Sequence, residues 1–279
     1  MGTTADYLTQ LIDSKSDIKA AIEEKGVTVS GGLSTYADAI RQINSGNGGY
    51  YIPSYVTFQG SNDISKLSKY TFEKRTSCEY MFYKANFKDA SILKDILDTS
   101  DIVDMEAMFA YCEELEIVPL LDTSKVVQME SMFYGCNKLT IVPQFDTSNV
   151  TNMKETFLGC DNLTELPEFN AENLVMVNNI FGANMPDTVW EGLKLLTNIG
   201  GFKDFGKSTV VSGTKTYGFL YSLPNLTHTS LMNVINNLYD RSTESKYYYT
   251  PELKFHPNHF DLLTEDELAI VTNKGWVVT

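Results

Sequence analysis

The sequence repeats itself with a period of 24 residues through the middle of the chain, and this repeat limits the possible folds more than any other feature. The tripeptide Asp-Thr-Ser begins at Asp98, Asp122 and Asp146. The same spacing relates four further sets: Met108-Phe109, Met132-Phe133, Thr156-Phe157 and Ile180-Phe181; Cys112, Cys136 and Cys160; Leu115, Leu139 and Leu163; Pro119, Pro143 and Pro167. A fixed period of this length indicates stacked units, each of which buries its apolar face against its neighbours.

Within one unit, the apolar residues predict two short elements. A spacing of three or four relates Val126, Met129, Met132, Phe133 and Cys136, and this predicts a helical turn or two, capped by Thr123 or Ser124. A second apolar set, Leu139, Val142 and Phe145, suits a short extended run. Proline cannot donate to a sheet ladder, so we expect strand pairing to end at each repeat proline. Equivalent side chains should then lie about 4.8 Å apart.

The repeat therefore predicts an α/β solenoid: a leucine-rich-repeat-like stack of about 24-residue repeats with a small helical N-terminal module and an α/β C-terminal cap. The predicted domains are an N-terminal helical anchor module (1–44), a linker with an N-terminal cap strand (45–69), the leucine-rich-type repeats (70–185) and the C-terminal α/β cap (186–279).

Two columns of chemically active residues allow more than one interpretation. Cys112, Cys136 and Cys160 could form a disulfide or a metal site, but their period places them in a stacked core, where small thiols pack well. We therefore favour an inert thiol column. The aspartates of the Asp-Thr-Ser motif could form a calcium ladder. We favour instead that each caps its own turn by accepting backbone N–H bonds.

Other catalytic or metal-binding patterns are weak. His256 and His259 resemble a ligand pair, but no cysteine or third histidine lies close by in the sequence, so we expect no metal there. The sequence contains no G-x-S-x-G motif, P-loop, dinucleotide fingerprint or zinc-protease motif. We therefore expect no enzymatic activity, no catalytic residues and no cofactor.

The N-terminal residues form a separate unit. Leu8, Leu11, Ile18 and Ile22 follow a three-four spacing that Lys15 interrupts, and the glycine-rich stretch 45–49 separates them from the repeats. A unit of about 40 residues rarely buries enough apolar surface to be stable alone. It could be a helical cap on the solenoid or an anchor that docks or self-associates through its apolar stripe. We favour the anchor, with these four residues as its binding surface.

The C-terminal region has clear local signals. Thr264 and Glu267 predict a capping box, Lys274-Gly275 predicts the end of that helix, and Trp276 to Val278 predicts a strand. Another amphipathic helix is predicted by Leu231, Val234, Ile235 and Leu238. Gly200 to Tyr217 predicts a hairpin or loop. The tyrosines at 247–249 suit a core edge, a sugar-stacking surface or a subunit contact equally well.

Charge and hydropathy exclude some partners. The formal net charge of −14 disfavours nucleic acid and anionic membrane surfaces. No run of about 18 apolar residues predicts a membrane span. The N-terminal sequence shows no secretory signal, so we expect folding in a reducing cytosol.

Three segments carry resemblances to known families. The unit that begins at Asp122 resembles the BspA-like bacterial surface protein repeat, a relative of the leucine-rich repeat, over about residues 70–185. Residues 6–29, followed by Tyr36-Ala-Asp-Ala-Ile40, are similar to N-terminal modules of tailed-phage structural proteins. Residues 263–276 resemble the end of repeat proteins found in the same setting. These resemblances imply binding to surfaces or host molecules and imply no catalytic residues.

Two functions are compatible with the sequence. The first is a non-enzymatic phage virion protein of the fibre, tail or head-decoration type, assembled in the host cytoplasm. Its N-terminal module would contact other virion proteins, and its repeat surface would bind a host surface glycan or protein. The alternative is a bacterial cell-surface adhesin of the BspA-like repeat type. The absence of an export signal favours the virion. We expect a homo-oligomer, with a trimer as the first state to test, because phage fibres commonly trimerise.

Overall fold

The computed structural model describes residues 50–52, 56–61, 64, 67–68, 70–177, 180–181, 193, 195–205, 216–217, 220, 223–243 and 251–279. The chain divides into two compact units, Met1–Val56 with Ser65–Glu73, and Thr57–Ile64 with Lys74–Thr279. In the first unit, strands β1 (Tyr50–Ile52) and β2 (Tyr70–Phe72) pair in parallel. The remaining description concerns the second unit. The predicted domain boundaries stay predictions.

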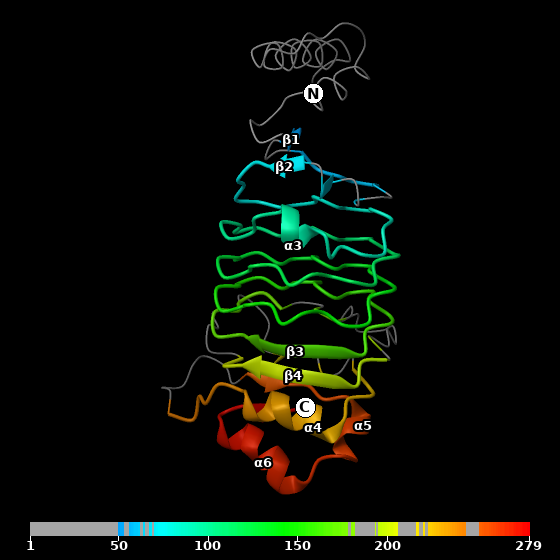
Figure 1. Cartoon of the computed structure of the whole chain (residues 1–279). Coiled ribbons are helices and arrows are strands. Elements are labelled where there is room, and N and C mark those ends of the chain that lie inside the picture. The colour runs from blue at the N-terminus through cyan, green and yellow to red at the C-terminus, as the bar shows by residue number, and fades with distance from the viewer. Residues whose placement is uncertain are drawn as a thin grey trace, which may run out of the picture. The chain divides into compact units, whose positions relative to one another are not determined.

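The second unit contains a series of repeats followed by a mixed C-terminal region (Figure 1). Its elements are α3 (Leu93–Ile96), β3 (Glu165–Asn170), β4 (Asn198–Lys203), β5 (Thr216–Tyr217), α4 (His228–Asn236), β6 (Glu252–Leu253), α5 (Pro257–Phe260), α6 (Glu265–Asn273) and β7 (Val277–Val278). Strands β3 and β4 pair in parallel, and β5, β6 and β7 form a parallel sheet in that order.

Successive repeats are joined by a series of single parallel bridges. These bridges link Ser77 to Asp104, Asp104 to Gln128, Gln128 to Asn152 and Asn152 to Met176, so that each step advances by one repeat. Each repeat therefore lies beside the one before it and the one after it, as the coils in Figure 1 show. The leucine-rich-repeat-like α/β solenoid stays a proposal, which these bridges support.

The predicted helical turns within the repeats are wrong. Residues 126–136 contain no helix, and Ser131 and Gly135 have φ angles of +55° and +70°. Every second backbone N–H in this segment donates a hydrogen bond to a carbonyl of the next repeat. These donors are Met129, Ser131, Phe133 and Gly135. The alternate N–H groups, from Met132, Tyr134 and Cys136, donate to carbonyls three residues back. A run of tight turns therefore satisfies the backbone, and it produces the same three-four spacing of buried residues as a helix.

Phenylalanine rings form a continuous column through the repeats. Neighbouring ring centroids in the series Phe82, Phe109, Phe133, Phe157 and Phe181 lie 5.6, 5.7, 5.8 and 6.1 Å apart. Every ring of the column is at most 1% exposed. The spacing exceeds the expected 4.8 Å or so because nearly parallel rings stack with an offset, which their quadrupoles favour. This column is the centre of the core.

The first repeat is longer than those that follow. Lys84 donates its N–H to Ala110, whereas Tyr111, in the equivalent position, donates to Tyr134. The first hydrogen bond therefore joins residues that are 26 apart in the sequence, and the second joins residues that are 23 apart. The first repeat thus contains three additional residues. It also contains the single-turn helix α3, which buries Leu93. The repeats therefore tolerate a change of length between their hydrogen-bonded segments.

The prediction that pairing ends at the repeat prolines holds for the early repeats only. Ile117 and Ile141 form single bridges ahead of Pro119 and Pro143, but β3 continues through Pro167 as far as Asn170. In β4, Gly200 lies across from this proline, and a Cβ there would come within 2.7 Å of the Pro167 carbonyl carbon. The strands can approach because Gly200 has no side chain. The predicted hairpin or loop at Gly200 to Tyr217 is wrong at both ends, where Gly200–Lys203 belong to β4 and Thr216–Tyr217 form β5. These two strands pair in parallel with β3 and β6, so they form no hairpin with each other.

The C-terminal predictions are largely confirmed. Thr264 and Glu267 form the capping box of α6, Lys274 is its C-cap, and Gly275 follows with a φ of +83°. Helix α4 buries Leu231, Val234 and Ile235, as the amphipathic spacing predicts, but it ends at Asn236. The fourth predicted helix residue, Leu238, lies beyond it and forms a bridge with Phe205. The final strand is confirmed as β7, although it begins one residue later than predicted.

The core predicts a large difference between two substitutions at Met132. This side chain is fully buried beside the phenylalanine column, so Met132→Asp would place an unpaired carboxylate in the core. We expect it to lower the free energy of unfolding by about 4 kcal/mol or more. Met132→Leu conserves apolar volume and should cost less than about 1.5 kcal/mol. Urea denaturation followed by circular dichroism measures both. Similar midpoints for the two variants would contradict this description of the core.

Candidate functional site

The predicted anchor residues Leu8, Leu11, Ile18 and Ile22 lie outside the described residues, as do the tyrosines at 247–249. The structure therefore does not test either prediction.

The aspartates of the Asp-Thr-Ser motif cap turns, as predicted. The Oδ1 atoms of Asp98, Asp122 and Asp146 accept the N–H groups of Ser100, Ser124 and Ser148 at 3.0, 3.0 and 2.9 Å. Hydrogen bonds from the serine side chain and backbone lower the pKa of Asp98 and of Asp122. Because each carboxylate is already engaged by its own turn, this column is a poor candidate for a cation site.

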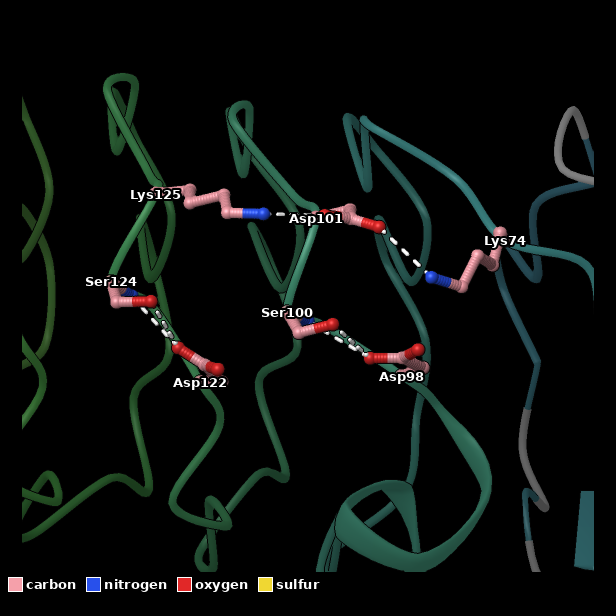
Figure 2. A network of polar contacts seen from close by, with 7 residues as sticks. All are labelled: Lys74, Asp98, Ser100, Asp101, Asp122, Ser124 and Lys125. Atoms are coloured by element: carbon pink, nitrogen blue, oxygen red, sulfur yellow. Dashed lines mark hydrogen bonds and ion pairs between the residues drawn. The ribbon is translucent and has the colours of Figure 1, made fainter.

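Exposed charges beside this column pair between repeats (Figure 2). Lys74 and Lys125 approach the carboxylate of Asp101 from either side, at 3.1 and 2.5 Å. Hydrogen bonds from Lys125 and Lys74 lower the pKa of Asp101. At the same position of later repeats, the Nδ2 atoms of Asn149 and Asn173 donate to Ser124 and Ser148 carbonyls at 2.7 Å. Exposed ion pairs stabilise little individually, but together these contacts favour the observed register.

The cysteine column is buried, as predicted. The thiols of Cys112, Cys136 and Cys160 are free and donate to the carbonyls of Phe82, Phe109 and Phe133 at 3.1, 3.1 and 3.0 Å. Burial raises the pKa of Cys112 to about 12 and raises the pKa of the other two thiols as well. At neutral pH these groups remain protonated, so they are poor nucleophiles and poor metal ligands.

The histidine pair is part of the fold. The side chain of His256 accepts the Asn258 N–H at the start of α5, and the Nδ1 of His259 accepts the His256 N–H at 3.3 Å. The Nε2 of His259 therefore carries the proton and donates to the Leu223 carbonyl at 2.8 Å. Both nitrogens of this fully buried ring are thus occupied. Within the described part of the chain, no group of three or more His, Cys, Asp or Glu is placed to hold a metal ion.

The best candidate for a site is an open depression between the first two repeats. Its volume is about 630 Å³. It is lined by Lys84, Ala85, Asn86, Lys88, Tyr111, Glu113 and Glu114. Most of these side chains are polar or charged, so the depression suits a polar ligand better than an apolar one. Its lining residues include no serine, threonine, cysteine or histidine.

Tyr111, which lines the depression, belongs to a cluster of four tyrosines. Tyr111 packs against Tyr83 at a centroid distance of 5.6 Å and against Tyr134 at 4.9 Å, and Tyr80 lies 5.5 Å from Tyr83. The Nζ of Lys84 lies over two of these rings, 5.1 Å from Tyr83 and 5.7 Å from Tyr111. A hydrogen bond with Tyr134, together with burial, raises the pKa of Tyr111. We call Tyr80, Tyr83, Tyr111 and Tyr134 the tyrosine row.

The repeat pattern does not reveal this surface, because the residues that form it depart from the repeat. Tyr111 occupies the position at which the next two repeats have Gly135 and Gly159. A Cβ at Gly135 would come within 3.2 Å of the Tyr111 ring, so the tyrosine lies over a glycine. A large aromatic residue at a surface position that is otherwise glycine was the available signal.

The buried thiols predict slow chemical modification. A thiol-reactive reagent at neutral pH should leave Cys112, Cys136 and Cys160 unlabelled in the native protein, because they are buried and protonated. In urea the same reagent should label all four cysteines of the chain. Mass spectrometry of the labelled peptides distinguishes the positions. Rapid native labelling at all three would contradict the buried column.

His259 predicts a loss of stability in mild acid. Burial lowers its pKa, so the unfolded imidazole takes up a proton at a higher pH than the folded one does. Its contribution is present above the unfolded pKa of about 6.5 and is lost as pH falls below that value. The free energy of unfolding should fall between about pH 7.5 and pH 5.5 by more in the wild type than in His259→Gln. Equal slopes for wild type and His259→Gln would contradict the assignment.

The comparisons with known proteins concern the repeats. Residues 76–187, less than half of the chain, match the family described as "Mycoplasma protein of unknown function, DUF285". That family is associated with BspA-like surface repeats, so the resemblance of the repeat block is confirmed at this level. No curated protein and no solved structure matches the chain.

Proposed function

We propose that this chain is a non-enzymatic structural protein of a phage virion, of the fibre, tail or head-decoration type. In this proposal its N-terminal module attaches it to the particle, and its repeats present a surface that binds a host molecule. One observation carries the binding role. The thiols and motif aspartates of the described repeats are engaged by the fold. In contrast, Tyr111 and the depression that it lines are open to solvent, and the other three tyrosines of the row are half-buried.

The proposal that this protein belongs to a phage virion rests on its N-terminal sequence. Residues 6–29 and 36–40 are similar to modules of tailed-phage structural proteins, and their apolar stripe is too small for an independent core. We propose that Leu8, Leu11, Ile18 and Ile22 contact other virion proteins or further copies of this chain, with a trimer as the first state to test. The net charge of −14 argues against nucleic acid and anionic membrane as partners. In the part of the chain that is described, no helix is both long enough and apolar enough to cross a membrane.

A bacterial cell-surface adhesin is the second candidate. The match of residues 76–187 to a family associated with BspA-like surface repeats favours it. Labelling with an antibody against this chain separates the two candidates. Label on purified phage particles supports the virion protein. Label on bacteria that carry no phage supports the adhesin and would reject the virion assignment.

The proposed anchor predicts a loss of attachment without a loss of the repeats. Replacing both Leu11 and Ile18 with Asp should reduce incorporation into particles at least about tenfold, because two charges would interrupt the apolar stripe. The control, Leu11→Ile with Ile18→Leu, retains the apolar character and should incorporate normally. Immunoblotting of purified particles measures incorporation, and circular dichroism checks that each variant is folded. Normal incorporation of the double Asp variant would place the anchor elsewhere in the chain.

A further inference from the structure

We propose that the depression beside Tyr111 is a carbohydrate-binding site for uncharged sugar units, hexoses or N-acetylhexosamines, of a surface glycan. This inference rests on the proposed function, because it names the ligand class of the repeat surface. It applies to a virion protein and to an adhesin alike.

The depression exists because two adjacent segments differ in length. They run from Lys84 to Asp89 in the first repeat and from Tyr111 to Ile117 in the second, and we call them corners. Lys84 and Tyr111 occupy equivalent positions in the backbone ladder, 27 residues apart. The next bridge, between Asp89 and Ile117, joins residues that are 28 apart. The corner of the first repeat thus uses one residue fewer than the corner of the second. The space lies at this mismatch, and residues from both corners line it. It is therefore a local feature of one pair of repeats.

The tyrosine row supplies a pre-formed surface for stacking. Tyr111 lines the depression and remains 38% exposed, although it contacts Tyr83, Tyr134 and the ammonium group of Lys84. The packing against its neighbours and over Gly135 limits the ring to few orientations. A pyranose ring has one face of C–H groups, which packs on an aromatic ring at little cost when that ring is already ordered. Tyr111 is therefore the expected stacking residue, and the Lys84 ammonium, which lies 5.7 Å from its ring centroid, moves aside when the sugar binds.

The polar lining complements sugar hydroxyls. Each hydroxyl both donates and accepts hydrogen bonds, so a sugar site needs acceptors and donors together. Glu113 and Glu114 supply carboxylate acceptors, and the Asn86 amide supplies both kinds of group. Lys84 and Lys88 supply donors, and Lys88 is additionally held by Glu116 at 3.3 Å. Stacking and polar groups of both kinds thus meet in one depression.

The charges favour a neutral sugar over an anionic one. Two lysines and two glutamates line the depression, so its formal charge is balanced. The chain as a whole carries −14, which opposes the approach of sialylated or sulfated glycans. A bound carboxylate or sulfate would also lie close to Glu113 and Glu114. An uncharged sugar avoids both penalties.

A glycan array tests the proposal with the full-length protein. The array carries oligosaccharides that end in glucose, galactose, mannose, N-acetylglucosamine or N-acetylgalactosamine, with sialylated and sulfated glycans for contrast. We expect binding to at least one uncharged terminal sugar and weaker binding to its charged derivatives. Titration calorimetry with the soluble oligosaccharide then gives the affinity of each variant.

Tyr111→Ala should lower the affinity at least about tenfold, whereas Tyr111→Phe retains the ring and should bind nearly as the wild type does. Glu113→Ala removes an exposed acceptor that the fold does not require and should weaken binding severalfold. Ile141→Ala removes an exposed side chain that does not line the depression and should have no effect. Denaturation midpoints check that the variants are folded.

Two results would overturn this inference. One is binding to no uncharged glycan, or to charged glycans alone. The other is sugar binding that neither Tyr111→Ala nor Glu113→Ala changes, which would place the sugar elsewhere. The particle-incorporation measurement does not involve sugars, so a negative array with normal incorporation rejects the glycan site and leaves the proposed function standing.

Discussion

The backbone hydrogen bonds between repeats are the constraint on which the rest of this structure depends. From Met129 to Gly135, every second N–H donates to the following repeat, and the alternate groups close tight turns within their own repeat. This pattern satisfies the backbone only when neighbouring repeats stay in register. Register in turn places like side chains in columns. The stacked phenylalanines follow from it, and so do the thiols, each of which donates to a phenylalanine carbonyl of the preceding repeat. At Gly159 a Cβ would come within 3.3 Å of the Gly135 Cα, so even the glycines are aligned.

The same constraint explains where the candidate site lies. The first repeat has a shorter corner than the second, and the depression lies at that mismatch. The tyrosine row also belongs to this end of the ladder, since the later repeats carry Gly135, Leu158 and Gly159 at the corresponding positions. Backbone mismatch and aromatic residues therefore coincide between residues 80 and 134.

Sequence reasoning succeeded where a residue's role is set by its own repeat or its own helix. The turn-capping aspartates, the buried cysteines and the capping box of α6 all depend on local spacing, and the structure confirms them. It failed where the conformation of a segment depends on the neighbouring repeat or strand. Tight turns and a helix bury the same three-four pattern, so Ser131 with its positive φ was not foreseen. Strand β3 passes Pro167 because Gly200 lies on the partner strand. The depression depends on a difference between two repeats, which no single repeat reveals. The N-terminal anchor lies outside the described residues and stays a prediction.

The distribution of polar chemistry supports the proposed binding role of the repeats. Catalysis by side chains needs groups whose proton affinity suits the reaction and whose lone pairs or protons are available. In the described repeats the thiols are held protonated by burial, and the motif aspartates are engaged by their own turns. The exposed Asp101 is shared between two lysines. The groups that line the depression are exposed and are arranged around an ordered aromatic ring. Such a surface can recognise the shape and hydroxyl pattern of a ligand. This supports the proposal that the repeats serve recognition, whichever particle or cell carries them.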